Sequence, residues 1–414
     1  MKKYILDTAE NRAFLTELQN ELLAFGVRFP APDGTSYYLS SDGAPMTERA
    51  RETWITCRMA HVYSIGSALG FPGSDALVDQ AVKGLCTVLY DYINGGYYPG
   101  ILPEGVPLPE KQCYGHAFVI LAACSAYLAG RPSAKELLDD STEIFLRKFW
   151  DDDKGLSVDT WNTEFRRLEP YRGLNANMHS VEAFLAAADV TGEEIWRKRA
   201  GRIIEHVLNW AEDNHWRIPE HFTEDWVPDL EYNADKPDDP FKPYGATPGH
   251  GIEWGRLVTQ WALSTFRDAP EQAEPYIAKA CRLYEQAIAD GWNADGEPGI
   301  VYTTGWDGKP VVHDRMHWTL AEAINTSAVL YHVTGNPLYK EHYAMYMQYL
   351  DETVHDQVNG SWFHQLDEHN QLKETVWPGK SDIYHALQST LIPKLDPSVS
   401  VAVAVKRGLY LEGE

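Results

Sequence analysis

His116–Leu128 (HAFVILAACSAYL) and Ala134–Phe149 (AKELLDDSTEIFLRKF) are neighbouring segments of opposite character, and together they decide the fold. The first segment is apolar on almost every side, so a helix formed by it has to be covered all round. The second carries apolar residues at three- and four-residue spacing between charged ones, which is typical of a helix with one face in water. The pair predicts an inner helix followed by an outer helix that covers it.

The same alternation recurs along the chain, which holds about twelve segments of helical periodicity and hardly any long alternating strand pattern. Repetition of one helical pair indicates a repeat architecture, in which each unit buries its apolar face against its neighbours. Six such pairs predict an all-α fold, an (α/α)6 barrel of six inner and six outer helices. Further inner segments are Val181–Ala187 and Leu320–Val333, and further outer segments are Glu193–Trp210, Pro275–Ala289 and Tyr339–Glu352.

The inner helices open with polar and aromatic motifs that recur roughly every 60 to 75 residues. A closed ring would place all six openings round one central cavity. An open solenoid would use the same helix pairs but would not need the openings to converge. The motifs are Trp54-Ile-Thr-Cys-Arg58, Gln112-Cys-Tyr114-Gly-His116, Asn175-Ala-Asn177-Met-His179, His250-Gly-Ile-Glu253-Trp254, His317-Trp318-Thr-Leu-Ala-Glu322 and Asp382-Ile-Tyr-His385.

Short loops rich in Gly, Asp, Asn and aromatic residues follow the charged helices. Asn-Gly and Asp-Gly favour tight turns, so we expect short β-hairpins at one rim of the barrel. The loops are Tyr92–Tyr98, Trp150–Gly155, Trp292–Gly296 and Val358–Phe363.

One connection, between Trp210 and His250, is too long for an ordinary loop and contains six prolines and many acidic residues. We expect residues 211–249 to form a lid or rim over the pocket, with a disordered insertion as the alternative. Since no other stretch looks like a domain boundary, residues 1–414 are expected to form a single catalytic domain.

Composition narrows the class of partner. The formal net charge of -24 argues against nucleic acid and against an anionic membrane surface. Fourteen Trp and 23 Tyr residues suit a pocket that stacks on sugar faces, although most of them are expected to pack between helices. Five cysteines without a Cys-x-x-Cys pair, and an N-terminus without a signal-peptide pattern, predict a cytoplasmic protein with reduced thiols. The oligomeric state, monomer or homo-oligomer, is left open.

Two histidines carry a carboxylate at a spacing of three. His250 and Glu253 lie on one side of a helix, and a carboxylate that accepts from an imidazole fixes its tautomer and raises its basicity. Asp382 and His385 repeat this spacing on the last inner helix. One such pair is commonplace on a surface, but two at equivalent places in different repeats predict paired proton-transfer groups.

Metal and cofactor chemistry are not expected. His179, His250, Glu253 and His385 could supply metal ligands, but they come from three repeats and form no compact signature such as His-Glu-x-x-His. His179 itself is either a satisfied core histidine or a ligand of a substrate hydroxyl. Phosphate-binding, dinucleotide-binding and nucleophile-elbow motifs are absent from the sequence, which disfavours nucleotide cofactors and serine hydrolysis.

Several motifs, taken together and in order, resemble the N-acylglucosamine 2-epimerase superfamily. They run over nearly the whole chain, from Trp54-Ile-Thr-x-Arg58-Met-x-His61 to the last inner helix, and the similarity is greatest to the aldose–ketose isomerase branch, which includes mannose and sulfoquinovose isomerases. The other motifs that carry the resemblance are Asn175-Ala-Asn-Met-His179, Thr247-Pro-Gly-His250-x-Ile-Glu253-Trp254 and Asp382-Ile-Tyr-His385.

The resemblance implies an (α/α)6 barrel and isomerisation through a cis-enediol, with no metal or cofactor and with a monosaccharide as partner. His250 and His385 match the two catalytic histidines of the family. We expect His385 to move the C2 proton to C1 and His250, oriented by Glu253, to act on the oxygens; the opposite assignment stays open. Positions matching the sugar pocket of the family are Arg58, Tyr114, Asn175, His179, Glu253, Trp318, Glu322 and Trp377.

One departure bears on the substrate. Sulfosugar enzymes of this branch carry, as the resemblance implies, a glutamine where this chain has Ser381, which favours an uncharged hexose. The expected reaction is interconversion of D-mannose and D-fructose, with D-lyxose and D-xylulose as a shorter pair. Arg58 and Gln365 keep a sulfoquinovose isomerase open, and two histidines could also serve a mannose/glucose 2-epimerase. From other classes, a glycoside hydrolase using Glu253 with Glu322 or Asp382, or a non-catalytic sugar-binding protein, would fit the same barrel.

Overall fold

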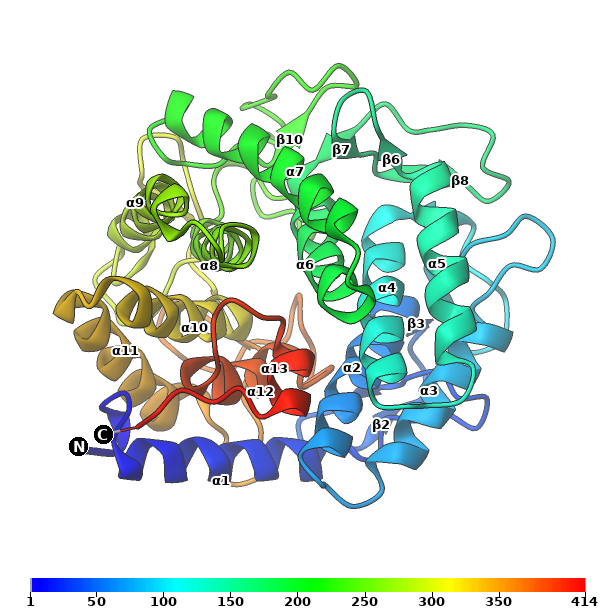
Figure 1. Cartoon of the computed structure of the whole chain (residues 1–414), viewed down its shortest axis with the longest axis horizontal. Helices are drawn as coiled ribbons and strands as arrows, with labels where there is room; N and C mark the ends of the chain where they lie inside the picture. Colours follow the sequence, from blue (N-terminus) through cyan, green and yellow to red (C-terminus); the bar gives the residue numbers. More distant parts are fainter. Residues whose placement is uncertain (1, 414) are drawn as a thin grey trace.

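The computed structural model describes residues 2–413, and its helices form a closed double ring (Figure 1). The inner helices contact one another in sequence order, and the last of them contacts the first. This arrangement confirms the (α/α)6 barrel. The inner helices are α2 (Thr53–Ala68), α4 (Cys113–Leu128), α6 (Leu174–Thr191), α8 (Pro248–Thr265), α10 (His317–Thr334) and α12 (Tyr384–Leu391).

Five outer helices each pack against the inner helix that precedes them in the chain. The sixth is the first helix of the chain, α1 (Ala9–Gly26), which packs against α12 and so closes the ring. This closure brings the two ends of the chain to one side of the molecule (Figure 1). The other outer helices are α3 (Ser74–Thr87), α5 (Ala134–Lys148), α7 (Glu194–Asp213), α9 (Glu274–Gly291) and α11 (Pro337–Tyr349).

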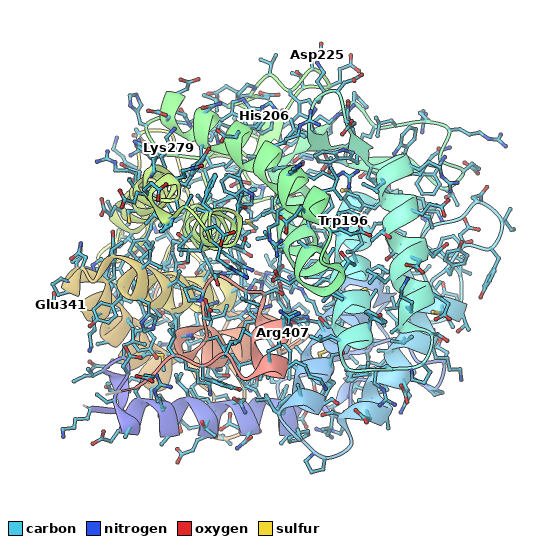
Figure 2. All side chains as sticks on the ribbon, in the orientation of Figure 1. Trp196, His206, Asp225, Lys279, Glu341 and Arg407 are labelled. Carbon is cyan, nitrogen blue, oxygen red and sulfur yellow. The ribbon has the colours of Figure 1, made fainter. Side chains whose placement is uncertain are left out.

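Burial follows the pattern read from the sequence. Almost all of α4 is buried, whereas α5 buries only the residues of one stripe. Figure 2 shows the charged side chains of Lys279 on α9 and Glu341 on α11 at the periphery of the ring. Each outer helix therefore shields an inner helix from water and keeps its own charges solvated. The buried stripe of α5 is Ala134, Leu137, Leu138, Ser141, Ile144 and Phe145.

Short strands join the rim segments of successive repeats. The strand that precedes an inner helix pairs with the segment before the next inner helix, as in β3–β4, β5–β8, β9–β10 and β13–β14. Ala246 bridges Thr304 in the same way, and the Lys380 amide donates to the Leu39 carbonyl at 2.9 Å to complete the circle. This belt fixes where every inner helix begins.

Local hairpins make up the rest of the rim. They include β1–β2, β6–β7 and β11–β12, and the four glycine-rich loops are each closed by antiparallel pairing. Gly95 and Gly360 have φ near +77° and +78°, a conformation that favours glycine. The expected hairpins are therefore present, although four of the seven strand pairs join different repeats instead. The strands are β1 (Tyr38–Leu39), β2 (Pro45–Met46), β3 (Arg51–Glu52), β4 (Gly100–Ile101), β5 (Glu110–Gln112), β6 (Trp150–Asp151), β7 (Leu156–Ser157), β8 (Thr160–Asn162), β9 (Arg172–Gly173), β10 (His221–Phe222), β11 (Thr303–Thr304), β12 (Pro310–Val312), β13 (Arg315–Met316) and β14 (Gln365–Leu366).

The opposite end of the barrel is covered by α13 (Val401–Arg407), which packs against α2, α4 and α6 (Figure 1). None of the helices within residues 2–413 combines the length and apolar character needed to cross a membrane. The remaining short elements are the 3₁₀ turns Lys2–Tyr4, Pro270–Gln272 and Ile392–Lys394 and the π-turn Leu350–Val354.

The long connection between α7 and α8 is irregular apart from β10. We call residues 214–247 the rim segment. Its backbone is tied to the barrel by the β9–β10 pair and by the Ala246–Thr304 bridge. It therefore runs across the rim between two fixed points.

Candidate active site

A cavity of about 360 Å³ lies where the inner helices begin. This volume is within the roughly 300–1,000 Å³ typical of small-molecule sites. The converging helix openings build its wall, and the rim segment contributes the edge of its mouth. Nine of the ten expected site residues line it, and Glu322 is the exception: Arg58, Tyr114, Asn175, His179, His250, Glu253, Trp318, Trp377 and His385.

His250 and His385 both lie beside one indole, that of Trp318. The His250 ring is 5.1 Å from the Trp318 ring between centroids, and the His385 ring is 6.0 Å from it. Both imidazoles line the same cavity. Two imidazoles from inner helices far apart in the chain thus face one ligand-sized space.

The carboxylate that holds His250 is Glu220, in the rim segment. His250 Nδ1 donates to Glu220 Oε1 at 2.9 Å. Glu253, the expected partner, instead accepts from Arg256 at 3.4 Å. The predicted orientation of His250 by Glu253 is therefore wrong: a spacing of three brings two side chains to one side of a helix but does not aim both at the same point.

His385 is also held by a carboxylate from another helix. Its Nδ1 donates to Glu322 Oε1 at 3.1 Å, and its Nε2 lies 3.5 Å from Arg58 Nη2. Asp382 pairs with Arg58 at 3.2 Å and accepts from the Tyr384 amide, two residues on, at 2.8 Å. The predicted Asp382–His385 pairing is thus wrong too, because Asp382 precedes the helix and its carboxylate is taken up by Arg58 and the Tyr384 amide.

Burial sets the charge state of His385. Removal from water lowers the pKa of His385, and the nearby Arg58 guanidinium lowers it further, whereas the hydrogen bond that His385 donates to Glu322 raises it. The imidazole is therefore neutral near pH 7. With the Nδ1 proton directed to Glu322, Nε2 carries the lone pair, which accepts only a long contact from Arg58 at 3.5 Å.

The Arg58 guanidinium packs against three aromatic rings. Its guanidinium carbon lies 4.7 Å from the Trp54 ring centroid, 4.9 Å from Phe118 and 4.7 Å from Tyr384. Nη2 donates to the Tyr114 hydroxyl at 3.2 Å. The buried cation is thus balanced by Asp382 and fixed in place, with its edge toward His385.

A second buried arginine lies beneath the cavity floor. Arg256 Nε donates to Glu322 Oε2 at 2.7 Å, and its Nη2 reaches Glu253. Burial raises the pKa of Glu322, but the Arg256 charge and the His385 hydrogen bond outweigh it and lower the pKa. Burial and the Glu322 charge raise the pKa of Glu253 well above its usual range. Glu322 is therefore a charged residue behind His385 and not part of the cavity lining.

His179 contacts the cavity and a third carboxylate. Its Nδ1 donates to Glu182 Oε2 at 3.3 Å, and burial lowers the pKa of His179 to about 4. Ligand atoms of His179, Glu182 and Glu253 lie within 4.8 Å of one another, a geometry that could hold a metal ion. Glu182 already accepts from the Tyr384 hydroxyl. This grouping differs from the four ligands considered from the sequence, and the absence of a metal stays a prediction.

Asp159 is a cavity residue that no sequence motif indicated. It lies between β7 and β8, accepts from the Gly173 amide at 2.8 Å, and lines the pocket. Burial raises the pKa of Asp159 to about 7. Glu220 was equally hidden: it lies in an irregular segment, 30 residues from its partner. The expected role of residues 211–249 as a pocket edge was the only signal that pointed toward it.

Two other residues are turned away from the cavity. Gln365 accepts from the Val376 and Trp377 amides at 2.8 and 3.1 Å, so it fixes the loop that presents Trp377. His116 accepts from the Tyr97 amide at 3.0 Å and donates to the Gln112 carbonyl, and burial lowers its pKa to about 3. Neither residue contributes to the lining.

Known proteins with similar sequences and structures agree with this architecture. Residues 34–389 match the family described as N-acylglucosamine 2-epimerase (GlcNAc 2-epimerase). The chain is 40% identical to a D-mannose isomerase of Thermobifida fusca over 96% of this chain and 97% of that protein. It is 41% identical to a D-mannose isomerase of Pseudomonas cannabina pv. alisalensis over 89% of each chain. A crystal structure of a D-mannose isomerase superposes with a TM-score of 0.84 at 25% identity, covering 94% of this chain and 98% of that one. The chain belongs to the N-acylglucosamine 2-epimerase family.

Proposed function

We propose that this protein is an aldose–ketose isomerase that interconverts D-mannose and D-fructose through a cis-enediol. The observation that carries the proposal is the pair of carboxylate-held imidazoles, His250 and His385, which lie beside Trp318 and line one cavity. The two relatives named D-mannose isomerase, which match nearly the whole chain at 40% and 41% identity, support the same substrate.

The reaction first opens the sugar ring and then moves hydrogen between neighbouring carbons. Ring opening transfers the O1 proton of mannose to O5 and leaves an aldehyde at C1. One base then removes the C2 proton while an acid protonates O1, which gives the enediol. Return of the first proton to C1 and loss of the O2 proton complete fructose, so no proton or electron is gained or lost overall.

We assign the carbon-to-carbon transfer to His385. Its Nε2 carries the lone pair that removes the C2 proton, because the Nδ1 proton is hydrogen-bonded to Glu322 and burial keeps the ring neutral. Arg58, 3.5 Å from that nitrogen, supplies positive charge beside the developing enediolate. His250 then exchanges protons with O1, O2 and O5. Because Glu220 accepts from Nδ1, the second nitrogen of His250 is left for this exchange.

An uncharged sugar fits the cavity better than a sulfosugar. Carboxyl side chains outnumber cationic ones on its wall, and Arg58 is already paired with Asp382. Gln365, considered as a donor to a sulfonate, is engaged with the loop before Trp377. A sulfonate would therefore have, among the described lining residues, only Lys242 of the rim segment as a cation without a carboxylate partner, and it would also meet the carboxylates of Glu220 and Asp382. The lining carboxyl groups are Glu52, Asp159, Glu220, Glu253 and Asp382, and the cations are Arg58 and Lys242.

A glycoside hydrolase is less well supported. That chemistry needs two carboxyl groups facing the scissile bond. Of the candidates, Glu322 is fully buried behind His385, and Asp382 is paired with Arg58. Glu253 alone would face the substrate as an acid.

We further propose that residues 1–414 act as one catalytic domain in which residues 211–249 form the edge over the pocket. Pro240, Phe241, Lys242 and Pro243 of the rim segment line the mouth. Phe241 is 73% exposed and stands edge-on to Trp377 at 6.4 Å. These two rings are therefore in edge-on contact where the rim segment meets the pocket wall.

The test is NMR spectroscopy of the purified protein with mannose, fructose or glucose in deuterated water, with and without a chelator. We expect fructose as the first product from mannose, deuterium at the reacting carbons, and unchanged rates with the chelator. Glucose as the first product would make the protein a 2-epimerase, and loss of activity with the chelator would overturn the metal-free route. Binding of mannose without turnover would overturn the proposal that the protein is an isomerase.

A further inference from the structure

The hydrogen bond between His250 and Glu220 joins an inner helix to the rim segment. Glu220 is only 7% exposed, and its Oε1 lies 2.9 Å from His250 Nδ1. Within residues 2–413, His250 Nε2 has no hydrogen-bond partner from the protein, and the ring lines the cavity. Nδ1 of His250 therefore faces a carboxylate, whereas Nε2 faces the open cavity.

Glu220 is held in place by its backbone and by its neighbour. Its carbonyl accepts from the Leu174 amide at 3.1 Å, where α6 begins. The next residue, His221, pairs with Gly173 in the β9–β10 ladder. The His221 side chain donates through Nε2 to the Pro243 carbonyl at 2.8 Å and accepts at Nδ1 from the Tyr171 hydroxyl at 2.7 Å. The carboxylate therefore has a defined position although it lies in an irregular segment.

A carboxylate can only accept, so the Glu220 contact requires the proton of a neutral His250 to reside on Nδ1. Nε2 then carries the lone pair that faces the cavity. Without this partner the proton would be free to move to Nε2, and the ring would be free to turn about its side-chain bonds. In that form His250 could not accept a proton from a sugar oxygen through the nitrogen nearest to it.

We propose that Glu220 is a positioning residue for the isomerisation: it holds His250 as the Nδ1–H tautomer and aims Nε2 at the bound sugar. The catalytic consequence rests on the proposed function, whereas the tautomer does not. Glu253 lies one turn along α8 from His250, but its carboxyl group accepts from Arg256 and does not take this role. His221, next to Glu220, is hydrogen-bonded to the Pro243 carbonyl at the mouth of the cavity. The position of the rim segment therefore determines the tautomer of His250.

The direct test is the protonation site of His250, read from two-bond proton–nitrogen correlation spectra of protein labelled with ¹⁵N-histidine. The signal of His250 is identified by its loss in His250→Gln. We expect Nδ1–H in the unaltered protein and a shift toward Nε2–H in Glu220→Ala. Glu220→Gln tests the role of the acceptor in a side chain of the same size, and we expect it to give a mixture of tautomers. Retention of pure Nδ1–H in both variants would overturn the proposal.

Two matched variants and a kinetic readout separate positioning from folding. Glu224→Ala removes an exposed acid from the same segment, and Glu253→Gln removes the acid on α8; neither should change the tautomer of His250. For isomerisation we expect kcat to fall about 10- to 100-fold in Glu220→Ala, part of what acid–base catalysis provides, with KM nearly unchanged. A loss confined to KM would overturn the positioning role. Absence of isomerisation in the unaltered protein would overturn the proposed function and leave the tautomer result standing.

Discussion

The two histidines of the cavity are supported by different kinds of wall. The rim wall consists of His250 and Glu220, and its carboxylate comes from an irregular segment. The helix wall consists of His385, Glu322 and Arg256, all on inner helices. Side-chain exposure is 14% for His250 but 4% for His385 and 0% for Glu322. The same contact, a carboxylate on Nδ1, is therefore made once near the mouth and once in the dry interior.

This difference assigns separate tasks to the two walls. In the interior a charge is tolerated only with a partner, so Glu322 needs Arg256 behind it. A buried, neutral imidazole suits removal of a weakly acidic proton from carbon. Near the mouth, water and the sugar hydroxyls can reach His250, which suits exchange with oxygen. Four changes to these walls test the comparison.

The largest effect is expected from His385→Ala. Loss of the proposed base should abolish exchange of the sugar C2 hydrogen with deuterated water and lower kcat by about a thousandfold or more. Exchange is measured by NMR from the C1 and C2 signals of mannose and fructose. His116→Gln, a change at a buried histidine outside the cavity, serves as the control. Normal exchange in His385→Ala would remove His385 from the role and favour His250.

Arg256→Met should destabilise the helix wall most. It leaves Glu322 charged and buried without its cation, and we expect the free energy of unfolding to fall by about 3–5 kcal/mol. Denaturant unfolding of the variant and the parent measures the difference. Arg256→Lys keeps the positive charge but cannot donate to Glu322 and Glu253 with the geometry of a guanidinium. Its free energy of unfolding should therefore fall by less than that of Arg256→Met. A change below about 1 kcal/mol in Arg256→Met would show that Glu322 is neutral in the folded protein.

Arg58→Met tests what sets the charge of His385. Besides burial, the Arg58 charge lowers the pKa of His385, while Glu322 and Asp382 raise it. Removing the cation should therefore raise that pKa, and since the base must be neutral, the acidic limb of the kcat profile should move to higher pH. Arg58→Lys keeps the charge and should leave the limb nearly in place. A limb that moves to lower pH would contradict this account.

The smallest effect concerns a buried histidine held only by backbone groups. His116 has a pKa of about 3 when folded and an ordinary, higher pKa when unfolded, so unfolding takes up a proton between these values. The parent should lose stability as pH falls below about 6.5, by about 1.4 kcal/mol per pH unit from this one group. In His116→Gln the slope of unfolding free energy against pH, between pH 6 and pH 4.5, should be shallower by that amount. Exposed His369 supplies the control variant, and equal slopes in parent and His116→Gln would contradict the prediction.

Much of the site was predictable because it lies on regular helices. Residues such as Arg58, Asn175 and Trp318 belong to the first two turns of inner helices, and a closed ring must bring those turns together. The partners of the histidines were not predictable from spacing. Glu253, three residues from His250, has Arg256 to neutralise within the barrel, and the rim segment brings Glu220 to His250 instead.

The sequence by itself determined the ring of paired helices, because local hydrogen bonding sets the helical period and the apolar pattern dictates which faces are covered. It also determined which side chains gather at one end. Only the tertiary structure decided which carboxylate holds which imidazole. That choice depends on where a loop and three inner helices meet and on which buried charges must be neutralised there, and no spacing along a single helix records it.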